Sequence, residues 1–206
     1  MKHKLFNLIA STVSLPERAI EETFSQEDLF NATDTPLLVP SDLREKQNSL
    51  WEQLATIEDD ELVQHVTSEI EITALKAGLF LIHDNLETSH QLSQSIQGKG
   101  KNVNGDYWHG IMHRREPDYS NAKYWFRRVG EHPIYPKLFD VVSAMNLPEN
   151  SRQLLENEKW DAFAFIDFCE TCAENPHSTK MKTARMIQWS EMLLLMEHCY
   201  HAAGGE

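Results

Sequence analysis

Apolar residues recur every three to four positions along most of this chain, and the two-residue alternation typical of strands is almost absent. The longest such stripe lies in the proline-free interval 59–97, where it runs from Leu62 to Leu81. Around residues 75–82 apolar side chains occur on nearly all sides, which is typical of a helix in the middle of a bundle. The pattern predicts an all-α fold, a single-domain helical bundle around a long central helix at 59–97.

Capping residues and prolines divide the remainder into further helices. Ser41 is a suitable N-cap for a helix over residues 42–57, because its hydroxyl can accept a hydrogen bond from an unpaired backbone amide. The residue before a proline disfavours the α region, so a helix through residues 105–116 is predicted to end ahead of Pro117. The same signals predict helices over residues 121–129, 135–145, 151–174 and 178–201. Ser120 or Asp118 is the expected cap of the first of these.

Breaks at Pro36 and Pro40 divide the chain into two parts. Residues 1–40 are expected to form an N-terminal arm with short helices, and residues 41–206 the all-α bundle domain. Lys2 precedes a short, interrupted apolar run without a clear cleavage site, which we interpret as a mature N-terminus rather than a signal peptide.

Composition limits the partners. The net charge is −13, which argues against nucleic acid, because phosphate backbones need a basic face. No stretch approaches the roughly 20 apolar residues of a membrane span, so no membrane partner is expected. Cys169, Cys172 and Cys199 are too few to staple the chain, which favours a reducing compartment and a cytoplasmic location. The first two form a CxxC motif within a helical stretch and are interpreted as core thiols. The oligomeric state stays open, a homo-oligomer included.

The segment 105–137 differs from the rest of the chain. Its six Lys and Arg against four Asp and Glu give a balance of +2, so the other residues carry −15. It mixes histidines and arginines with large aromatic rings, and such polar groups need partners when buried. A polar site with aromatic walls fits this mixture, and the local charge favours a small anionic molecule as the ligand.

The first functional hypothesis is therefore a pocket for an anionic ligand, such as a sugar acid or a phosphorylated metabolite. Guanidinium groups bind carboxylates and phosphates through paired hydrogen bonds. The predicted ligand-binding residues are Arg114, Arg115, Asn121, Trp125, Arg127 and Arg128. Because adjacent helical residues point in different directions, one arginine of each consecutive pair is expected to face inward. The sequence leaves open whether the protein is an enzyme; the candidate catalytic residues are His109, His113, Glu116 and Asp118.

The second hypothesis is a metal-binding helical protein. His109 and His113 are four residues apart and share one helix face, a spacing with which a single helix can hold a metal. An antiparallel neighbour at 59–97 would bring two more imidazoles to face them. The cofactor would be a divalent transition metal, and its ligands would be His83, His90, His109 and His113. A third hypothesis is a structural or interaction protein in which the charged residues form a buried polar network.

Residues 107–116 read YWHGIMHRRE, and Asp118, Asn121 and the run YWFRR at 124–128 follow. This pattern resembles a signature of uncharacterised bacterial and fungal proteins. No activity is established for that group, so the resemblance implies no reaction here. Gly110 stands where the common metalloprotease motif has glutamate, so that mechanism is not indicated.

Overall fold

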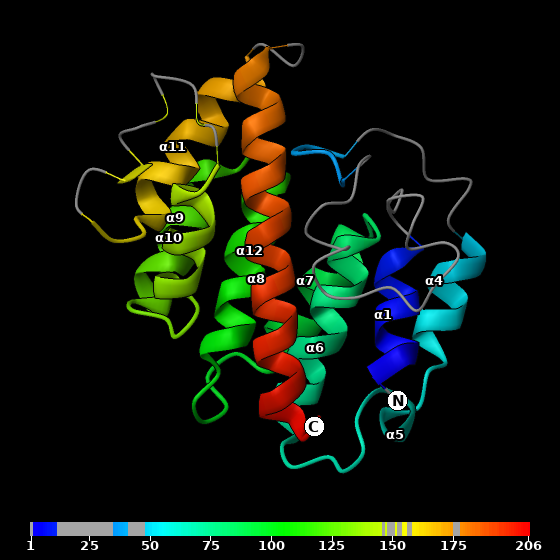
Figure 1. Cartoon of the computed structure of the whole chain (residues 1–206). Helices are drawn as coiled ribbons and strands as arrows, with labels where there is room; N and C mark the ends of the chain where they lie inside the picture. Colours follow the sequence, from blue (N-terminus) through cyan, green and yellow to red (C-terminus); the bar gives the residue numbers. More distant parts are fainter. Residues whose placement is uncertain are drawn as a thin grey trace.

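The computed structural model describes residues 2–11, 35–40, 48–145, 147, 151, 154–155, 158–174 and 178–206. Within these residues the chain is helical and contains no strand, which confirms the all-α prediction (Figure 1). The helices are α1 (Lys2–Ala10), α4 (Asn48–Ala55), α5 (Asp59–Leu62), α6 (Glu69–Ile82), α7 (Leu86–Ser95), α8 (Val103–Arg115), α9 (Tyr119–Val129), α10 (Tyr135–Ser143), α11 (Ala162–Ala173) and α12 (Thr179–Ala203).

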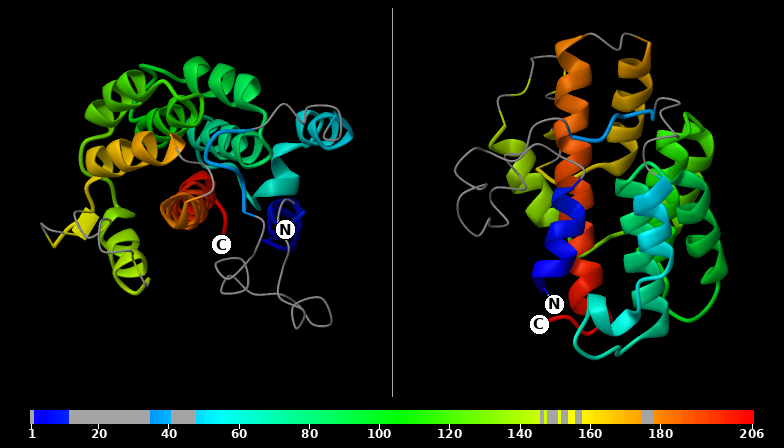
Figure 2. Two further views of the ribbon diagram at one scale, coloured as in Figure 1. Left: turned by 90° about the horizontal axis from the view of Figure 1, so that it is seen from above. Right: turned by 90° about the vertical axis from the view of Figure 1, so that its right-hand side faces the viewer.

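The longest described helix is α12, and the others are arranged in an open arc around it when the bundle is seen from above (Figure 2). It packs against α6, α10 and α11. Ser178 caps its first turn by accepting a hydrogen bond from the Met181 amide at 3.2 Å. Gly204 ends it with a φ of 113°, in the left-handed region that favours glycine. These two ends agree with the predicted helix over residues 178–201.

The predicted single helix over residues 59–97 is wrong, because three helices occupy this interval. Val63 is extended and ends α5, and Ser68 then caps α6. Asp84 has a φ of 61°, and Asn85 caps α7 through its side-chain oxygen. Short polar side chains at such positions offer the backbone an alternative to helical hydrogen bonds. The apolar spacing continues across both breaks, so periodicity alone does not reveal them.

Other predicted boundaries are confirmed near the middle of the chain. Helix α8 ends at Arg115, before Pro117, and Asp118 caps α9 by accepting from the Asn121 amide at 3.1 Å. The helix predicted from residue 151 is wrong at its start, because α11 begins only after Asp161 caps it. The cap expected at Ser41 and residues 12–34 of the predicted N-terminal arm lie outside the described residues.

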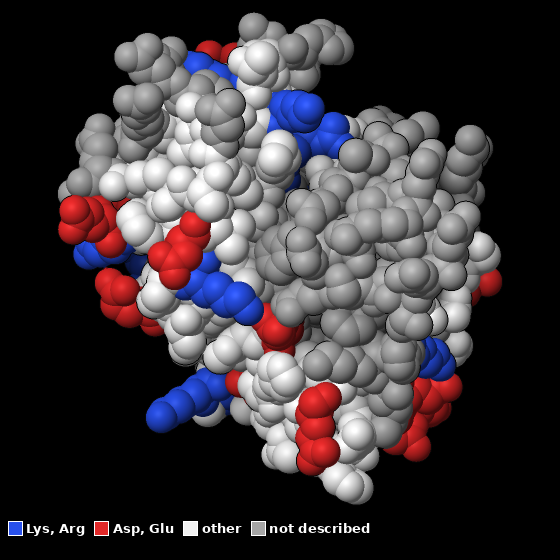
Figure 3. Space-filling view, in the orientation of Figure 1, with Lys and Arg blue, Asp and Glu red and all other residues white. Residues whose placement is uncertain are grey.

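The first helix belongs to the packed structure rather than standing apart from it. Leu5, Leu8 and Ile9 of α1 are buried, and α1 packs against α5 and α6. No described helix combines the length and apolarity that a membrane crossing requires. On the face shown in Figure 3, acidic and basic side chains of the described residues are interspersed.

Two consecutive arginines of α8 are completely buried. The guanidinium of Arg114 lies 2.5 Å from a carboxylate oxygen of Glu191 on α12. Glu191 also accepts a hydrogen bond from the Tyr107 hydroxyl at 3.0 Å. The expectation that one arginine of this pair faces outward is wrong, because neighbouring elements enclose both sides of α8 at this level. The network interpretation of the third hypothesis fits this pair of charges.

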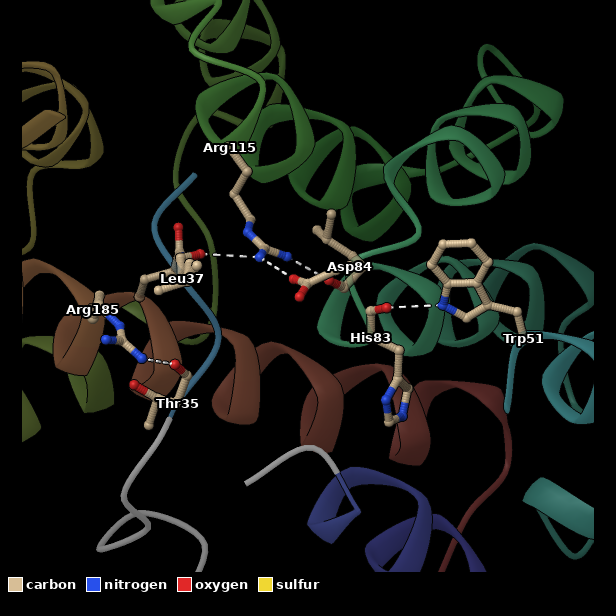
Figure 4. A network of polar contacts seen from close by, with 9 residues as sticks. Thr35, Leu37, Trp51, His83, Asp84, Arg115 and Arg185 are labelled. Carbon is tan, nitrogen blue, oxygen red and sulfur yellow. Dashed lines mark hydrogen bonds and ion pairs between the residues drawn. The ribbon is translucent and has the colours of Figure 1, made fainter. Parts of the chain in front are cut away.

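Arg115 joins three further parts of the chain (Figure 4). Its guanidinium donates to the backbone oxygens of Leu81 and Leu37, and it forms an ion pair with Asp84. Figure 4 also shows Arg185 of α12 donating to the backbone oxygen of Thr35. The described segment 35–40 is thereby held against α8 and α12 through its own carbonyl groups.

We predict that Glu191→Met lowers the free energy of unfolding by about 3–5 kcal/mol, because it leaves the buried Arg114 charge without its partner at similar side-chain volume. The double variant with Arg114→Met should regain most of this loss. Urea denaturation measures both. The control is Lys137→Ala, which removes an exposed ion pair with Glu197 and should cost less than about 1 kcal/mol. Equal losses in Glu191→Met and Lys137→Ala would contradict the assignment.

Candidate metal centre

Three histidines from two helices meet on one side of α8. His109 and His113 occupy successive turns of α8, and His90 reaches them from α7. One ring nitrogen from each lies within 4.8 Å of the other two. The ring centroids are 4.7 Å apart for His90 and His109, 5.4 Å for His90 and His113, and 4.9 Å for His109 and His113. Zinc–imidazole bonds are 2.0–2.1 Å long, so the three nitrogens would have to move closer together to bind one ion.

The close approach of α9 to α8 depends on a glycine. A Cβ atom at Gly110 would lie 2.7 Å from the ring of Phe126, so a larger residue here would push α9 away. With glycine in place, Trp125 stacks on His109 with a centroid separation of 3.7 Å and an interplanar angle of 16°. Trp125 therefore closes one side of the histidine group and restricts the rotation of the His109 ring.

His109 is buried, yet neither of its ring nitrogens has a hydrogen-bond partner among the described residues. Buried polar atoms are nearly always hydrogen-bonded, and an exception needs a physical explanation. A ligand that approaches from the side of His90 and His113 would supply the missing partner. This orphaned imidazole fits a metal ion, which requires an unprotonated ring nitrogen as its donor.

His113 has polar partners on both nitrogens. Its Nδ1 lies 3.2 Å from a carboxylate oxygen of Glu116, and the Asn121 side-chain nitrogen lies 3.1 Å from its Nε2. The same Asn121 nitrogen lies 3.4 Å from Nδ1, so it is placed beside the ring and not in line with either lone pair. A proton on Nδ1 therefore satisfies Glu116 and leaves the Nε2 lone pair free. Carboxylates hold metal-binding histidines in this way, since they select the tautomer and increase the basicity of the ligand nitrogen.

The electrostatics keep the inner imidazoles neutral. Burial lowers the pKa of His109 to about 3, with smaller contributions from His113, His90 and Arg128. Burial also lowers the pKa of His113, against the opposing effect of Glu116. Neutral imidazole is the form that binds metals, so these rings are ready for coordination at neutral pH.

His132 is a buried histidine of the opposite kind. Its Nε2 donates to the Asn104 side-chain oxygen at 2.8 Å, and its Nδ1 accepts from the Ile134 amide at 3.3 Å. Burial lowers its pKa to about 3 as well. Because both nitrogens have protein partners, His132 serves the packing of the bundle and is a matched control for His109.

His83 does not join the other three predicted metal ligands. It is completely buried, and its side chain points towards α1 while Trp51 donates to its backbone oxygen at 2.9 Å (Figure 4). The four-ligand prediction is thus wrong for His83. It assumed one continuous helix, whereas the break at residues 83–85 places His83 and His90 on separate helices with different directions.

The six predicted ligand-binding residues do not converge on one place. Asn121 and Trp125 lie at the histidines, whereas Arg114 and Arg115 point into the core. Of the other two arginines, Arg127 is exposed, and Arg128 pairs with Asp106 at 3.0 Å. Among the catalytic candidates, Asp118 lies at the start of α9, where its carboxylate caps the helix. Sequence reasoning missed Glu191 and Asp106 as the partners of arginines, because neither lies near its arginine in the sequence.

No known protein-family model matches this chain. Among solved structures, likewise, none matches it. These comparisons therefore assign no function to the signature at residues 107–116.

We predict that the stability of the metal-free protein falls as the pH drops below 6.5. Burial lowers the pKa of His83 to about 4 and those of His109 and His132 to about 3, whereas unfolded histidines titrate near 6.5. The unfolded chain thus takes up protons in the window in which the folded rings stay neutral. Each ring should then cost about 1 kcal/mol per pH unit.

Urea denaturation at pH 7.5, 6.5 and 5.5 in the presence of a chelator measures this effect. His132→Gln should make the pH dependence shallower, because one such ring is removed. An unfolding free energy that stays constant between pH 7.5 and 5.5 would show that these rings are not buried in the neutral form.

Proposed function

We propose that the protein binds a divalent transition metal through His90, His109 and His113. The observation that carries the proposal is the buried His109 ring, which has no hydrogen-bond partner among the described residues and lies against two other imidazoles. An unsatisfied buried ring costs free energy, and a bound metal ion would remove that cost. The nitrogens come from two helices that pack directly against each other, so little reorganisation is required.

The donor set favours particular metals. Three imidazoles, with no thiolate or carboxylate in the same group of described residues, suit zinc, copper, nickel or iron, and do not suit calcium or magnesium. Zinc accepts three histidines readily, and its filled d shell imposes no geometry on them. We therefore propose zinc as the first metal to test.

The arginines support the anionic-ligand hypothesis less well than the sequence suggested. Arg114 and Arg115 are paired with Glu191 and Asp84, and Arg128 is paired with Asp106. A guanidinium whose charge is already neutralised by a carboxylate is a weak site for a second anion. In the histidine group, by contrast, neither nitrogen of His109 has a partner among the described residues.

We predict that the untagged protein, purified without chelator, contains about one transition metal per chain, and that His109→Ala loses it. In the unsubstituted protein, zinc should raise the melting temperature of chelator-treated samples, because it binds only the folded state. Elemental analysis and isothermal titration calorimetry are the measurements.

His132→Ala is the matched control for this experiment, since it removes a buried neutral histidine whose nitrogens are satisfied within the protein. It should lower stability and keep the metal. If His109→Ala and His132→Ala retain metal equally, or if neither the wild type nor the control binds zinc, the proposed site is wrong.

We also predict that Glu116→Gln weakens zinc binding by about 10- to 100-fold, because the His113 tautomer and basicity depend on the carboxylate. Glu87→Gln is the control: Glu87 lies on α7 and accepts a hydrogen bond from Gln91, at 2.6 Å, rather than from a histidine. Zinc affinities measured by competition with a chromophoric chelator compare the two variants. Equal effects in both would rule out a positioning role for Glu116.

A further inference from the structure

Three imidazoles complete only part of a metal coordination sphere. Zinc sites with three protein ligands keep the fourth tetrahedral position for a small molecule, whereas closed structural sites use four protein ligands. None of the three cysteines belongs to the histidine group. Cys199 instead lies next to Trp108 at 3.4 Å, and burial keeps the pKa values of Cys169 and Cys199 well above the usual range.

The histidine group is more accessible on one side than on the other. His109 and His113 are buried, and Trp125 covers the face of His109. His90 is only partly buried, and the Glu116 side chain beside His113 is 57% exposed. His90 and Glu116 are therefore the side chains of this region that lie nearest to solvent, and a ligand would approach the group from their side.

Asn121 supplies a hydrogen-bond donor at the same place. Its side-chain nitrogen lies 3.1 Å from Nε2 and 3.4 Å from Nδ1 of His113, so it is placed beside the ring and not in line with the Nε2 lone pair. That lone pair stays free for a metal when Nδ1 donates to Glu116. The amide N–H can then donate to an acceptor that is bound close to the metal.

The charge of the occupied site also indicates the kind of ligand. Three neutral imidazoles contribute no charge to balance the 2+ of the metal, and the carboxylate beside them, that of Glu116, is 57% exposed, so solvent screens much of its effect. The arginines nearby do not change this balance, since Arg128 is paired with Asp106 and Arg114 with Glu191. A small anion at the remaining position would lower the net charge.

We propose that the metal held by these three histidines binds a small monovalent anion at its fourth position, with the Asn121 amide donating a hydrogen bond to it. This inference rests on the proposed metal site. It joins the two sequence hypotheses in one place, since the anion is attracted by the metal rather than by the arginines.

The test uses the whole protein loaded with Co²⁺, whose visible absorption reports its coordination. Titration with sodium acetate, and separately with sodium azide, should produce a saturable change in the absorption of the bound Co²⁺. Asn121→Ala should weaken anion binding by about tenfold, the loss of one hydrogen bond to a charged group, while Co²⁺ affinity changes much less. Ser120→Ala is the control, because its hydroxyl contacts Asp118 and not a histidine.

The outcomes separate the two proposals. Co²⁺ that binds with an absorption insensitive to both anions would overturn the open position and leave the metal site standing. Equal anion affinities in Asn121→Ala and Ser120→Ala would overturn the role of Asn121. Failure of Co²⁺ to bind, or full retention of Co²⁺ in His109→Ala, would overturn the proposed function and this inference with it.

Discussion

The bundle depends on the burial of two adjacent arginine charges in α8. A guanidinium removed from water is very costly unless a carboxylate and further acceptors receive it. Arg114 therefore requires Glu191 of α12, and Arg115 requires Asp84 together with carbonyl oxygens at the end of α6 and in the segment 35–40. These partners lie far apart in the sequence. Because both arginines must contact all of these partners at once, α8 is fixed in its rotation about its own axis and in its position along that axis.

The candidate metal centre benefits from this anchoring. His113 precedes Arg114 directly, and Arg115 holds the junction from which α7 starts towards His90. The imidazoles thus stand on two helices whose relative position is set by buried ion pairs and tight packing, rather than on loops. A site held on rigid elements keeps its geometry before the ligand arrives, which favours binding.

The buried histidines show why composition alone does not identify a site. His109 and His132 both lie in the 105–137 segment, both are buried, and burial lowers both pKa values. Only the hydrogen bonds distinguish them, because His132 has protein partners at both nitrogens and His109 has none among the described residues. A sequence shows that an imidazole is present, and its partners become known only once distant elements are placed beside it.

Local interactions within the sequence were sufficient to predict the all-α class, the C-terminal end of α8, both ends of α12, a cap of α9 at Asp118 or Ser120, and the shared face of His109 and His113. Each depends on hydrogen bonds or spacings within one or two helical turns. The break between α6 and α7 also carries a local signal, the Asn85 cap, which the apolar periodicity conceals. Tertiary structure alone decided that His83 leaves the histidine group and that Arg114 and Arg115 both turn inward. Those outcomes depend on how the helices rotate and pack against partners that are distant in the sequence, such as Glu191. The arrangement is selected because buried charges must be paired, and no local sequence pattern encodes those pairs.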